Sequence, residues 1–368
     1  MYELNVKEIK AYFRSIHSKS EAVEYFSKFS GKYYAFDYET ASKDPRKLSD
    51  ALRYDRAYLM GASFCFDYNE AVYVPIQHPE ENAEPEAIKV MTDFMRAYPC
   101  AAFNMPFEYG FTLYHFGFVP DVYTDMAVLM KVFDSNLPNS LKQLIFALYK
   151  YHMQTFVEVT NNRKDFRMVS VKNGFFYGGS DSLWTFRAIE DYEPKIRADA
   201  GLNNILNLEN RLTPIICDLV YNSVCVDRDL LQSYRPVVEG NIKKIEQFIV
   251  ERIADKCPDL VTPGIIQGLF TLNMNIDSPK DVKAFFHRLG YPVEGTGKEI
   301  LRALKDPVAD AFVALREEKK LLNTYITAYE DFIGEGDILR FGIRQIGAPT
   351  GRLAGSKPNL MAVPKIRD

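Results

Sequence analysis

The sequence predicts an α/β domain with a mixed central sheet, followed by a mostly α-helical region. Between residues 32 and 150, short apolar and aromatic segments alternate with amphipathic segments of helix length, the pattern of an α/β domain. Beyond about residue 180 the strand pattern nearly vanishes, and capped amphipathic segments follow one another. The 368 residues correspond to two or three domains at the usual ~100–200 residues each.

The elements of the first region follow in order along the chain. Residues 5–30 have apolar side chains spaced at ~3.6 residues, which predicts one or two helices ending before Gly31. Segments of strand and helix character then alternate, with Pro106 at the first position of one helix and Gly117 at its end. The predicted strands are 32–40, 57–67, 71–77, 100–104 and 121–125, and the predicted helices are 84–99, 106–117, 125–133 and 140–150.

The second region and the tail complete the predicted organisation. After the helical segments, the chain closes with a strand-like start and a basic, Gly/Pro-rich extended tail. The predicted divisions are a helical N-terminal extension (1–30), the α/β domain (31–197), the helical region (198–336) and the tail (337–368).

Composition excludes several classes of protein. The net charge of −4 means that any affinity for nucleic acid must come from local patches. No run of 18 apolar residues and no signal-peptide pattern is present, so no membrane partner is expected. Five cysteines without a CxxC pair argue against zinc and disulfide frameworks and for a reducing compartment.

Two carboxylates stand two residues apart in a predicted strand. Asp37 and Glu39 in FDYET therefore point to the same face, where they repel each other unless something neutralises them. A divalent cation is the common remedy, and oxygen ligands favour Mg²⁺ or Mn²⁺. The alternative is a strand end whose carboxylates face water.

Two further segments carry polar residues that bear on this alternative. AFNMPFEYG places Asn104 and Glu108 at a strand-to-helix junction, and YGGSDS places Tyr177 and Asp181 at the start of a predicted helix, four residues apart on one face. Glu108 is also consistent with an ordinary acidic residue in a first helical turn. Asp181 with Ser180 is also consistent with a helix cap.

The order and spacing of the three segments resemble the 3′→5′ exonuclease superfamily with four acidic residues and a tyrosine. The likeness is greatest to the proofreading domain of family A DNA polymerases, the bacterial DNA polymerase I type. This resemblance implies a ribonuclease H-like exonuclease domain that acts on single-stranded DNA 3′ ends. It implies that Asp37, Glu39, Glu108 and Asp181 bind two Mg²⁺ or Mn²⁺ ions, and that Tyr177 with Glu39 orients the attacking water.

Glu108 departs from the family pattern, which usually has aspartate there. The extra methylene requires the carboxylate to retract or to bind through a water, and a displacement of ~1 Å at a reacting centre costs roughly 10²-fold. Asp121 or Asp125 could compensate in principle, but Asp125 matches a family aspartate that is not a metal ligand. Phe176, five residues before Asp181, argues against the histidine-bearing branch.

The helical half resembles the same family independently. Residues 210–231, 275–293 and 319–325 resemble its thumb, and ILRFGIRQIGAPTGRLAGSKPNLMAVPK resembles its T-G-R-L-S-S-x-x-P-N-L-Q-N-I-P stretch at the start of the palm. Residues 337–368 carry a net charge of +4, a basic patch suited to primer–template DNA. Arg352 is expected to donate to minor-groove acceptors, which are nearly alike in every correct base pair. The expected DNA-binding residues are Asn104, Arg344, Gln345, Thr350, Arg352, Lys357 and Asn359.

The palm aspartate motifs of the family follow this stretch, and the sequence ends at Asp368 before them. We therefore expect no nucleotidyl-transfer site in this chain, which would be part of a longer or split polymerase, a shortened chain or a natural short protein. The main hypothesis is a proofreading 3′→5′ exonuclease in the cytoplasm of a bacterium or a phage-infected cell. The alternative is a catalytically weak module that holds primer–template DNA for a second polypeptide carrying palm and fingers.

Overall fold

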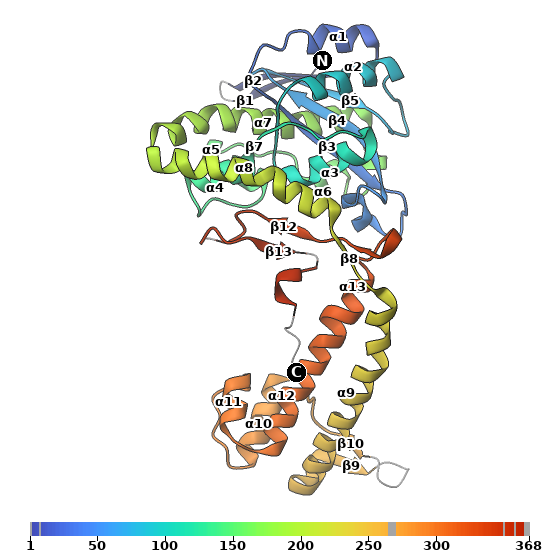
Figure 1. The fold of residues 1–368 in the computed structure, drawn as a ribbon, viewed down its shortest axis with the longest axis vertical. Coiled ribbons are helices and arrows are strands. Elements are labelled where there is room, and N and C mark those ends of the chain that lie inside the picture. The colour runs from blue at the N-terminus through green and yellow to red at the C-terminus, as the bar shows by residue number, and fades with distance from the viewer. Residues whose placement is uncertain (1, 7–8, 264–269, 349, 357, 364–368) are drawn as a thin grey trace. The chain divides into compact units, whose positions relative to one another are not determined.

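The computed structural model describes residues 2–6, 9–263, 270–348, 350–356 and 358–363 (Figure 1). It divides into two compact units. The first comprises Met1–Asn222 and Gly342–Ser356, and the second comprises Ser223–Phe341 and Lys357–Asp368. This division falls after Asn222 rather than after residue 197, and it assigns part of the predicted tail to the first unit.

Within the described residues, the first unit contains a seven-stranded mixed sheet in the order β1-β2-β5-β4-β3-β6-β7. The pairs β2/β5, β3/β6 and β6/β7 are parallel, and the other neighbouring pairs are antiparallel. The strands are β1 (Tyr2–Val6), β2 (Ile9–Ser15), β3 (Tyr34–Ser42), β4 (Ala57–Cys65), β5 (Glu70–Pro75), β6 (Cys100–Ala102) and β7 (Val122–Asp125). A mixed sheet flanked by helices confirms the predicted α/β class.

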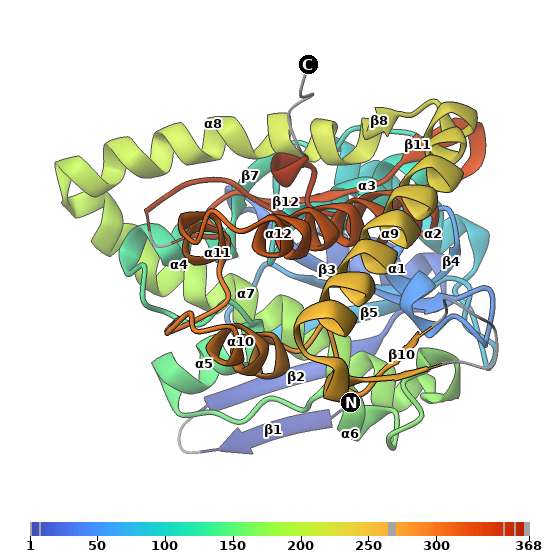
Figure 2. The same cartoon turned by 90° about the horizontal axis from the view of Figure 1, so that it is seen from below.

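Helices cover both faces of this sheet. On one face lie α1 (Lys19–Phe26), α2 (Pro85–Ala97) and α3 (Met105–Phe116), which pack against Tyr34, Phe36 and Tyr38 of β3. On the other lie α4 (Met126–Phe133), α5 (Leu141–Tyr149) and α7 (Val171–Ala198), which pack against Tyr33 and Ala35. The long helix α7 lies across the neighbouring strands β2, β5, β4 and β3 (Figure 2). A short helix α6 (Phe156–Val159) and 3₁₀ turns at Leu48–Leu52 and Phe166–Met168 lie in the connections.

Helix α8 (Ala200–Asn222) belongs to the first unit because it packs against α3, α4 and α7. This packing explains why the unit extends past the predicted boundary. Whether the two units are an exonuclease domain and a thumb stays a prediction.

The N-terminal segment corrects one prediction. Residues predicted to be helical form the strands β1 and β2, and only α1 is a helix, begun by a capping box between Ser18 and Glu21. In β2, Ala11 and Phe13 are buried whereas Tyr12 is exposed, a period of two that matches a strand. Parallel pairing with β5 fixes this alternation against the sheet.

The start of α7 corrects a second prediction. The helix begins at Val171, where the Ser170 hydroxyl accepts the Asn173 N–H, so Tyr177 and Asp181 lie inside it and not at its start. Ser180 does not cap a helix either, since its hydroxyl donates to the Phe176 carbonyl at 2.6 Å. Two consecutive glycines are unfavourable inside a helix, but Gly178 and Gly179 lie within α7, close to the side chains of Glu39 and Phe13 of the sheet.

The second unit is mostly helical, as predicted. Its core joins residues of α9, α10, α11 and α12, among them Ile249, Phe285, Phe286 and Phe312. Its helices are α9 (Arg228–Lys256), α10 (Pro279–Arg288), α11 (Lys298–Ala303), α12 (Pro307–Lys320), a π-helical stretch (Leu321–Thr327) and α13 (Ala328–Glu330). Short strand pairs join β8 (Val224–Cys225) to β11 (Ile338–Leu339) and β9 (Val261–Pro263) to β10 (Phe270–Leu272), and 3₁₀ turns lie at Pro258–Leu260, Glu335–Asp337 and Leu360–Ala362. No helix in the described parts of either unit is long and apolar enough to cross a membrane.

The predicted extended tail instead forms a hairpin of β12 (Gly342–Arg344) and β13 (Ala354–Ser356), with Ile343 opposite Gly355. The hairpin is part of the first unit. Lys357, predicted to bind DNA, lies outside the described residues, as do positions 364–368.

Candidate metal centre and surrounding cavity

Strand β3 brings two acidic residues to the face of the sheet that α7 covers. Tyr34, Phe36 and Tyr38 point to the opposite face, so Asp37 and Glu39 share the α7 side, as the spacing of two predicted. The pairing with β4 shifts register directly after Glu39, which pairs with Gly61 while Thr40 pairs with Leu59. Such bulges bend a strand and re-aim the side chains beside it.

Helix α7 approaches these carboxylates closely through two glycines. A Cβ at Gly178 would lie 3.2 Å from Glu39 Oε1, and one at Gly179 would lie 2.8 Å from a Phe13 ring carbon. The Ser63 hydroxyl ties the layers together, with the Gly178 carbonyl at 2.8 Å and the Asp37 carbonyl at 3.3 Å. The sequence Tyr-Gly-Gly-Ser-Asp therefore allows a helix to lie against β3 with Asp181 facing the strand.

Asp37, Glu39 and Asp181 form the one group of potential metal ligands in the described residues. Each offers a carboxylate oxygen, and these oxygens lie within 4.8 Å of one another. Glu39 is 6% exposed and Asp181 8%, and Glu39 Oε1 has no hydrogen-bond partner among the described residues. Burial, and then the charge of a neighbouring carboxylate, raises the pKa of both Asp37 and Glu39 well above the usual range. A buried acidic group with an unpaired oxygen fits a divalent cation.

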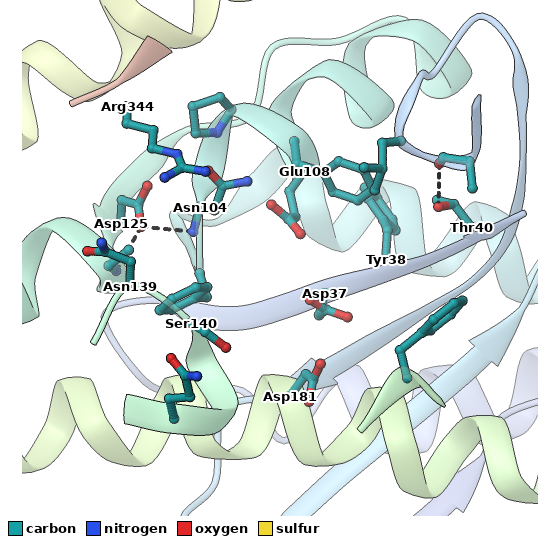
Figure 3. Close-up of a pocket in the computed structure, with 18 of the residues that line it drawn as sticks. Asp37, Tyr38, Thr40, Asn104, Glu108, Asp125, Asn139, Ser140, Asp181 and Arg344 are labelled. Carbon is teal, nitrogen blue, oxygen red and sulfur yellow. Dashed lines mark hydrogen bonds between the residues drawn. The ribbon is translucent and has the colours of Figure 1, made fainter. Parts of the chain in front are cut away.

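Glu108 reaches toward this group from the other side. Figure 3 shows the carboxylates of Glu108 and Asp181 directed toward Asp37 from opposite directions. Glu108 is 2% exposed, its Oε2 has no partner among the described residues, and burial followed by the charge of Asp37 raises its pKa. Its oxygens nevertheless lie outside the three-residue group. Of the four acids that the sequence predicts to converge, three have oxygens within 4.8 Å of one another.

Asp125 holds the backbone from which Glu108 projects. Its carboxylate accepts the N–H groups of Asn104 at 3.0 Å, Met105 at 2.9 Å and Ala127 at 2.9 Å (Figure 3). Asn104 adopts a left-handed conformation (φ 70°) at the start of α3. Asp125 thus fixes the junction between β6 and α3. That it binds no metal stays a prediction.

Tyr177 lies one helical turn before Asp181 and packs on Phe166. Burial is the largest cause that raises its pKa, and the charges of Asp181, Glu39 and Asp37 add to it. Its phenol therefore stays protonated beside the acidic group and can donate a hydrogen bond.

Lys142 of α5 is a site residue that the sequence analysis missed. Its ammonium donates to Asp181 Oδ1 and lies 4.3 Å from the centre of the Tyr177 ring. A lysine in the first turn of a helix is unfavourable for the helix dipole, and this is the one signal by which the sequence could have indicated it.

A cavity of about 1350 Å³ opens over the acidic group. Its wall includes Asp37, Glu39, Glu108, Tyr177 and Asp181 together with the α4–α5 connection and residues 343–347. Asn104 and Arg344 are exposed on this wall and lie near each other in Figure 3. The Arg344 guanidinium has no hydrogen bond or ion pair to the described residues.

The other predicted DNA-binding residues have different surroundings. Gln345 is buried: its Nε2 donates to Glu209, and its Oε1 accepts from the Thr213 hydroxyl at 3.0 Å. Thr350 and Arg352 are exposed in the loop between β12 and β13. Asn359, in the second unit, accepts the Met361 N–H at 3.1 Å.

A scan against protein-family models found no match. Curated relatives include DNA polymerase I of Chloroflexus aurantiacus, 24% identical over 90% of this chain, and of Borreliella burgdorferi, 22% identical over 96%. The DNA polymerase I of Caldicellulosiruptor bescii is 29% identical over 43% of the chain. This chain spans about a third of the length of the first two relatives, 35% and 37% respectively.

The fold is similar to that of a solved structure, the POL domain of Pol1 from M. smegmatis in complex with DNA primer-template and dNTP. The TM-score is 0.71 at 14% sequence identity, over 97% of this chain and 56% of that one. The fold of both units therefore has a counterpart in that polymerase domain. This likeness concerns the fold, whereas the DNA polymerase I relatives are similar to the chain in sequence over most of its length.

Proposed function

We propose that the first unit is a ribonuclease H-like, metal-dependent 3′→5′ exonuclease that removes nucleotides from DNA 3′ ends. The observation that carries the proposal is the meeting of Asp37, Glu39 and Asp181, whose oxygens lie within 4.8 Å although the residues come from a strand and a distant helix. A cluster of three carboxylates, two of them buried and one with an unpaired oxygen, has no evident structural purpose, whereas Mg²⁺ or Mn²⁺ binds such oxygens.

Each residue of the site has a proposed part. Asp37, Glu39 and Asp181 would hold Mg²⁺ or Mn²⁺, with Glu108 reaching it directly or through water. When bound, such an ion lowers the pKa of water and stabilises the charge that develops on the phosphate. The protonated Tyr177, together with Glu39, would orient the attacking water toward the phosphorus for in-line displacement of the 3′ oxygen. This mechanism needs no covalent intermediate.

The cavity supports a polymeric substrate. Its volume of about 1350 Å³ exceeds the ~300–1,000 Å³ typical of small-molecule sites. Arg344 and Asn104, exposed on its wall, would bind phosphate and base edges of a single-stranded 3′ end. Thr350, Arg352 and Asn359 remain proposed contacts to primer–template DNA, together with Lys357. Gln345 is removed from this proposal because its amide is already bonded to Glu209 and Thr213.

The test uses single-stranded DNA labelled at its 5′ end, so that shortening from the 3′ end gives a ladder. With Mg²⁺ or Mn²⁺ the wild-type chain should produce the ladder, and Asp37→Ala and Glu39→Ala should slow it by about 10²-fold or more, because each removes a metal ligand worth several kcal/mol. Asp93→Ala, on the exposed side of α2, is the matched control and should match wild type. Equal degradation by all four proteins would refute the proposal.

A second candidate function is favoured by Glu108, whose oxygens lie outside the group. In this case the chain is a catalytically weak module that holds primer–template DNA for a partner with palm and fingers. Tight duplex binding without metal-dependent nucleotide release would favour it, and absence of duplex affinity would exclude it.

A further inference from the structure

The connection between α6 and the 3₁₀ turn at Phe166–Met168 contains a loop whose backbone is largely left-handed. Asn161 (φ 49°), Asn162 (φ 65°) and Lys164 (φ 56°) all have positive φ angles. Asparagine tolerates this conformation, whereas lysine rarely adopts it away from a helix end. A residue that is held in an unfavourable backbone conformation is a candidate for a function of its side chain.

Helix ends explain the other left-handed lysines in the described parts of the chain. Lys150 (φ 56°) is the C-cap of α5, and Lys305 (φ 52°) follows the C-cap of α11, where left-handed residues are common. Lys164 has no such explanation, because α6 already ends before its C-cap Thr160. Glycine would fit the backbone at position 164 better, which leaves the side chain as the reason for a lysine.

The loop is held firmly on both sides of Lys164. The Thr160 hydroxyl donates to the Phe156 carbonyl at 2.7 Å and accepts the Lys164 N–H at 3.2 Å, and Thr160 is only 2% exposed. Two residues after Lys164, Phe166 is fully buried and packs on the ring of Tyr177. The backbone of Lys164 is therefore fixed relative to the candidate site, so a ligand of its ammonium is bound with little further loss of backbone freedom.

The side chain of Lys164 lies on the cavity wall without a partner. Lys164 is exposed there, and its ammonium makes no hydrogen bond or ion pair to any residue that the structure describes. Lys131 on the same wall differs, since its ammonium donates to the Ser135 and Leu137 carbonyls. Among the described residues of the wall, Arg344 is the other cation without a partner, and it already has a proposed part in binding DNA.

A nucleic acid strand needs unpaired cations in this cavity. The carboxylates of Asp37, Glu39, Glu108 and Asp181 on its wall repel phosphate groups wherever no cation neutralises them. A lysine that binds a phosphate releases counterions from the strand and so adds affinity, without reading the base. Lys164 makes no ion pair with these carboxylates and is therefore available to a phosphate.

We propose that Lys164 binds a backbone phosphate of single-stranded DNA, so that the loop Thr160–Lys164 is a binding subsite on the cavity wall. The proposal rests on the exonuclease function proposed above and deepens it, because it assigns a contact to the strand apart from the acidic group. Lys164 is then a residue for affinity and positioning, and the unfavourable conformation of its backbone is compensated by the phosphate that its side chain binds.

The test measures the binding of a short fluorescent oligothymidylate to the whole chain by fluorescence anisotropy, without divalent cations so that the DNA stays intact. Each phosphate contact to a single strand adds about 0.7 to the slope of log affinity against log salt concentration. Lys164→Met should lower this slope by about 0.7 and weaken binding roughly fivefold at low salt, the upper range for one exposed ion pair. Lys164→Arg should keep the wild-type slope, because it keeps the charge. Oligoadenylate should give the same differences, since phosphate contacts carry no sequence information.

Two further variants separate the charge of Lys164 from its backbone and from general electrostatics. Lys164→Gly should unfold at the same or a higher urea concentration than wild type, because glycine adopts the left-handed conformation readily, yet it should lose DNA affinity as Lys164→Met does. Lys172→Met is the matched control: Lys172 is exposed in the first turn of α7, outside the cavity wall, and its replacement should leave binding unchanged.

Three results would overturn the proposal. They are wild-type affinity and salt slope in both Lys164→Met and Lys164→Gly, an equal loss in Lys172→Met, and a wild-type chain that does not bind the single strand.

The proposed exonuclease function fails differently. If Lys164→Met lowers the salt slope but wild type gives no DNA ladder with Mn²⁺, the function is refuted and the subsite stands. If the ladder appears and the Lys164 variants bind DNA as wild type does, the function stands and the subsite is refuted.

Discussion

The neighbouring glycines of α7 offer a sharp test because they face different partners. At Gly178, an added Cβ would approach Glu39 Oε1 to 3.2 Å and Cγ to 3.3 Å, so the carboxylate must move by a few tenths of an ångström. At Gly179, an added Cβ would lie 2.8 Å from a ring carbon of Phe13, which is fully buried. One alanine therefore perturbs the site and the other perturbs the core.

The two variants are expected to differ in the free energy of unfolding and in the nuclease rate. Alanine in a helix interior is favoured over glycine by about 0.5–1 kcal/mol. In Gly178→Ala this gain offsets the shift of Glu39, so the free energy of unfolding should stay within about 1 kcal/mol of wild type. In Gly179→Ala, overpacking costs about 1–3 kcal/mol, which leaves a net loss. The nuclease rate should fall roughly three- to tenfold in Gly178→Ala, below the ~10²-fold cost of a 1 Å misplacement.

Urea denaturation gives the free energies, and the DNA ladder assay gives the rate per folded molecule. Gly179→Ala should retain the wild-type rate, since the three atoms nearest to the added Cβ belong to Phe13 and Ala71 and not to a carboxylate. A Gly178→Ala protein with full activity, or one that loses more stability than Gly179→Ala, would contradict the geometry given for α7.

Three further predictions concern the support of the site. Ser63→Ala should lower the free energy of unfolding by about 1–2 kcal/mol, because a buried hydroxyl bonded to the Gly178 carbonyl is lost; urea denaturation measures this, and an unchanged midpoint would exclude a role for Ser63 in joining the layers. Asp125→Asn should lower the free energy of unfolding by about 1–3 kcal/mol, because the NH₂ group of the asparagine would face backbone N–H donors. This variant should still bind Mn²⁺, and a loss of Mn²⁺ binding would indicate that Asp125 is a metal ligand. Burial raises the pKa of Asp37 and Glu39, so the folded metal-free chain binds more protons than the unfolded chain above the ordinary carboxyl pKa of ~4. The free energy of unfolding without metal should therefore fall as the pH rises above ~4. The apparent affinity for Mn²⁺ should rise with pH, and Mn²⁺ binding should release protons, which titrations in buffers of different ionisation enthalpy detect. An affinity that does not depend on pH would contradict this prediction.

The sequence predicted most elements of the first unit because their patterns are local. The FDYET strand and the helix begun at Pro106 show their period and punctuation within a few residues. The N-terminal strands were predicted as helix because the alternation of Ala11, Tyr12 and Phe13 is short, and pairing with β5 decides their conformation.

At the site, too, the sequence predicted what depends on local patterns and missed what depends on tertiary packing. Asp37, Glu39 and Asp181 were predicted from spacing and resemblance, and the structure brings them together. The interior position of Tyr177 in α7 could not be predicted, because Gly178 and Gly179 favour a break unless a sheet lies against them. Lys142 was missed because nothing local to α5 links it to an aspartate 39 residues away.

The hairpin of β12 and β13 has a consequence for biosynthesis. It supplies residues 343–347 to the cavity wall, yet the ribosome makes it only after the whole helical segment Ser223–Phe341. Until then Thr213 and Glu209 of α8 lack the Gln345 amide that they bond in the finished fold. A nascent or proteolysed chain that stops at Asn222 therefore has its acidic residues but lacks residues 343–347 of the cavity wall, so the cavity over the acidic group is completed late in translation.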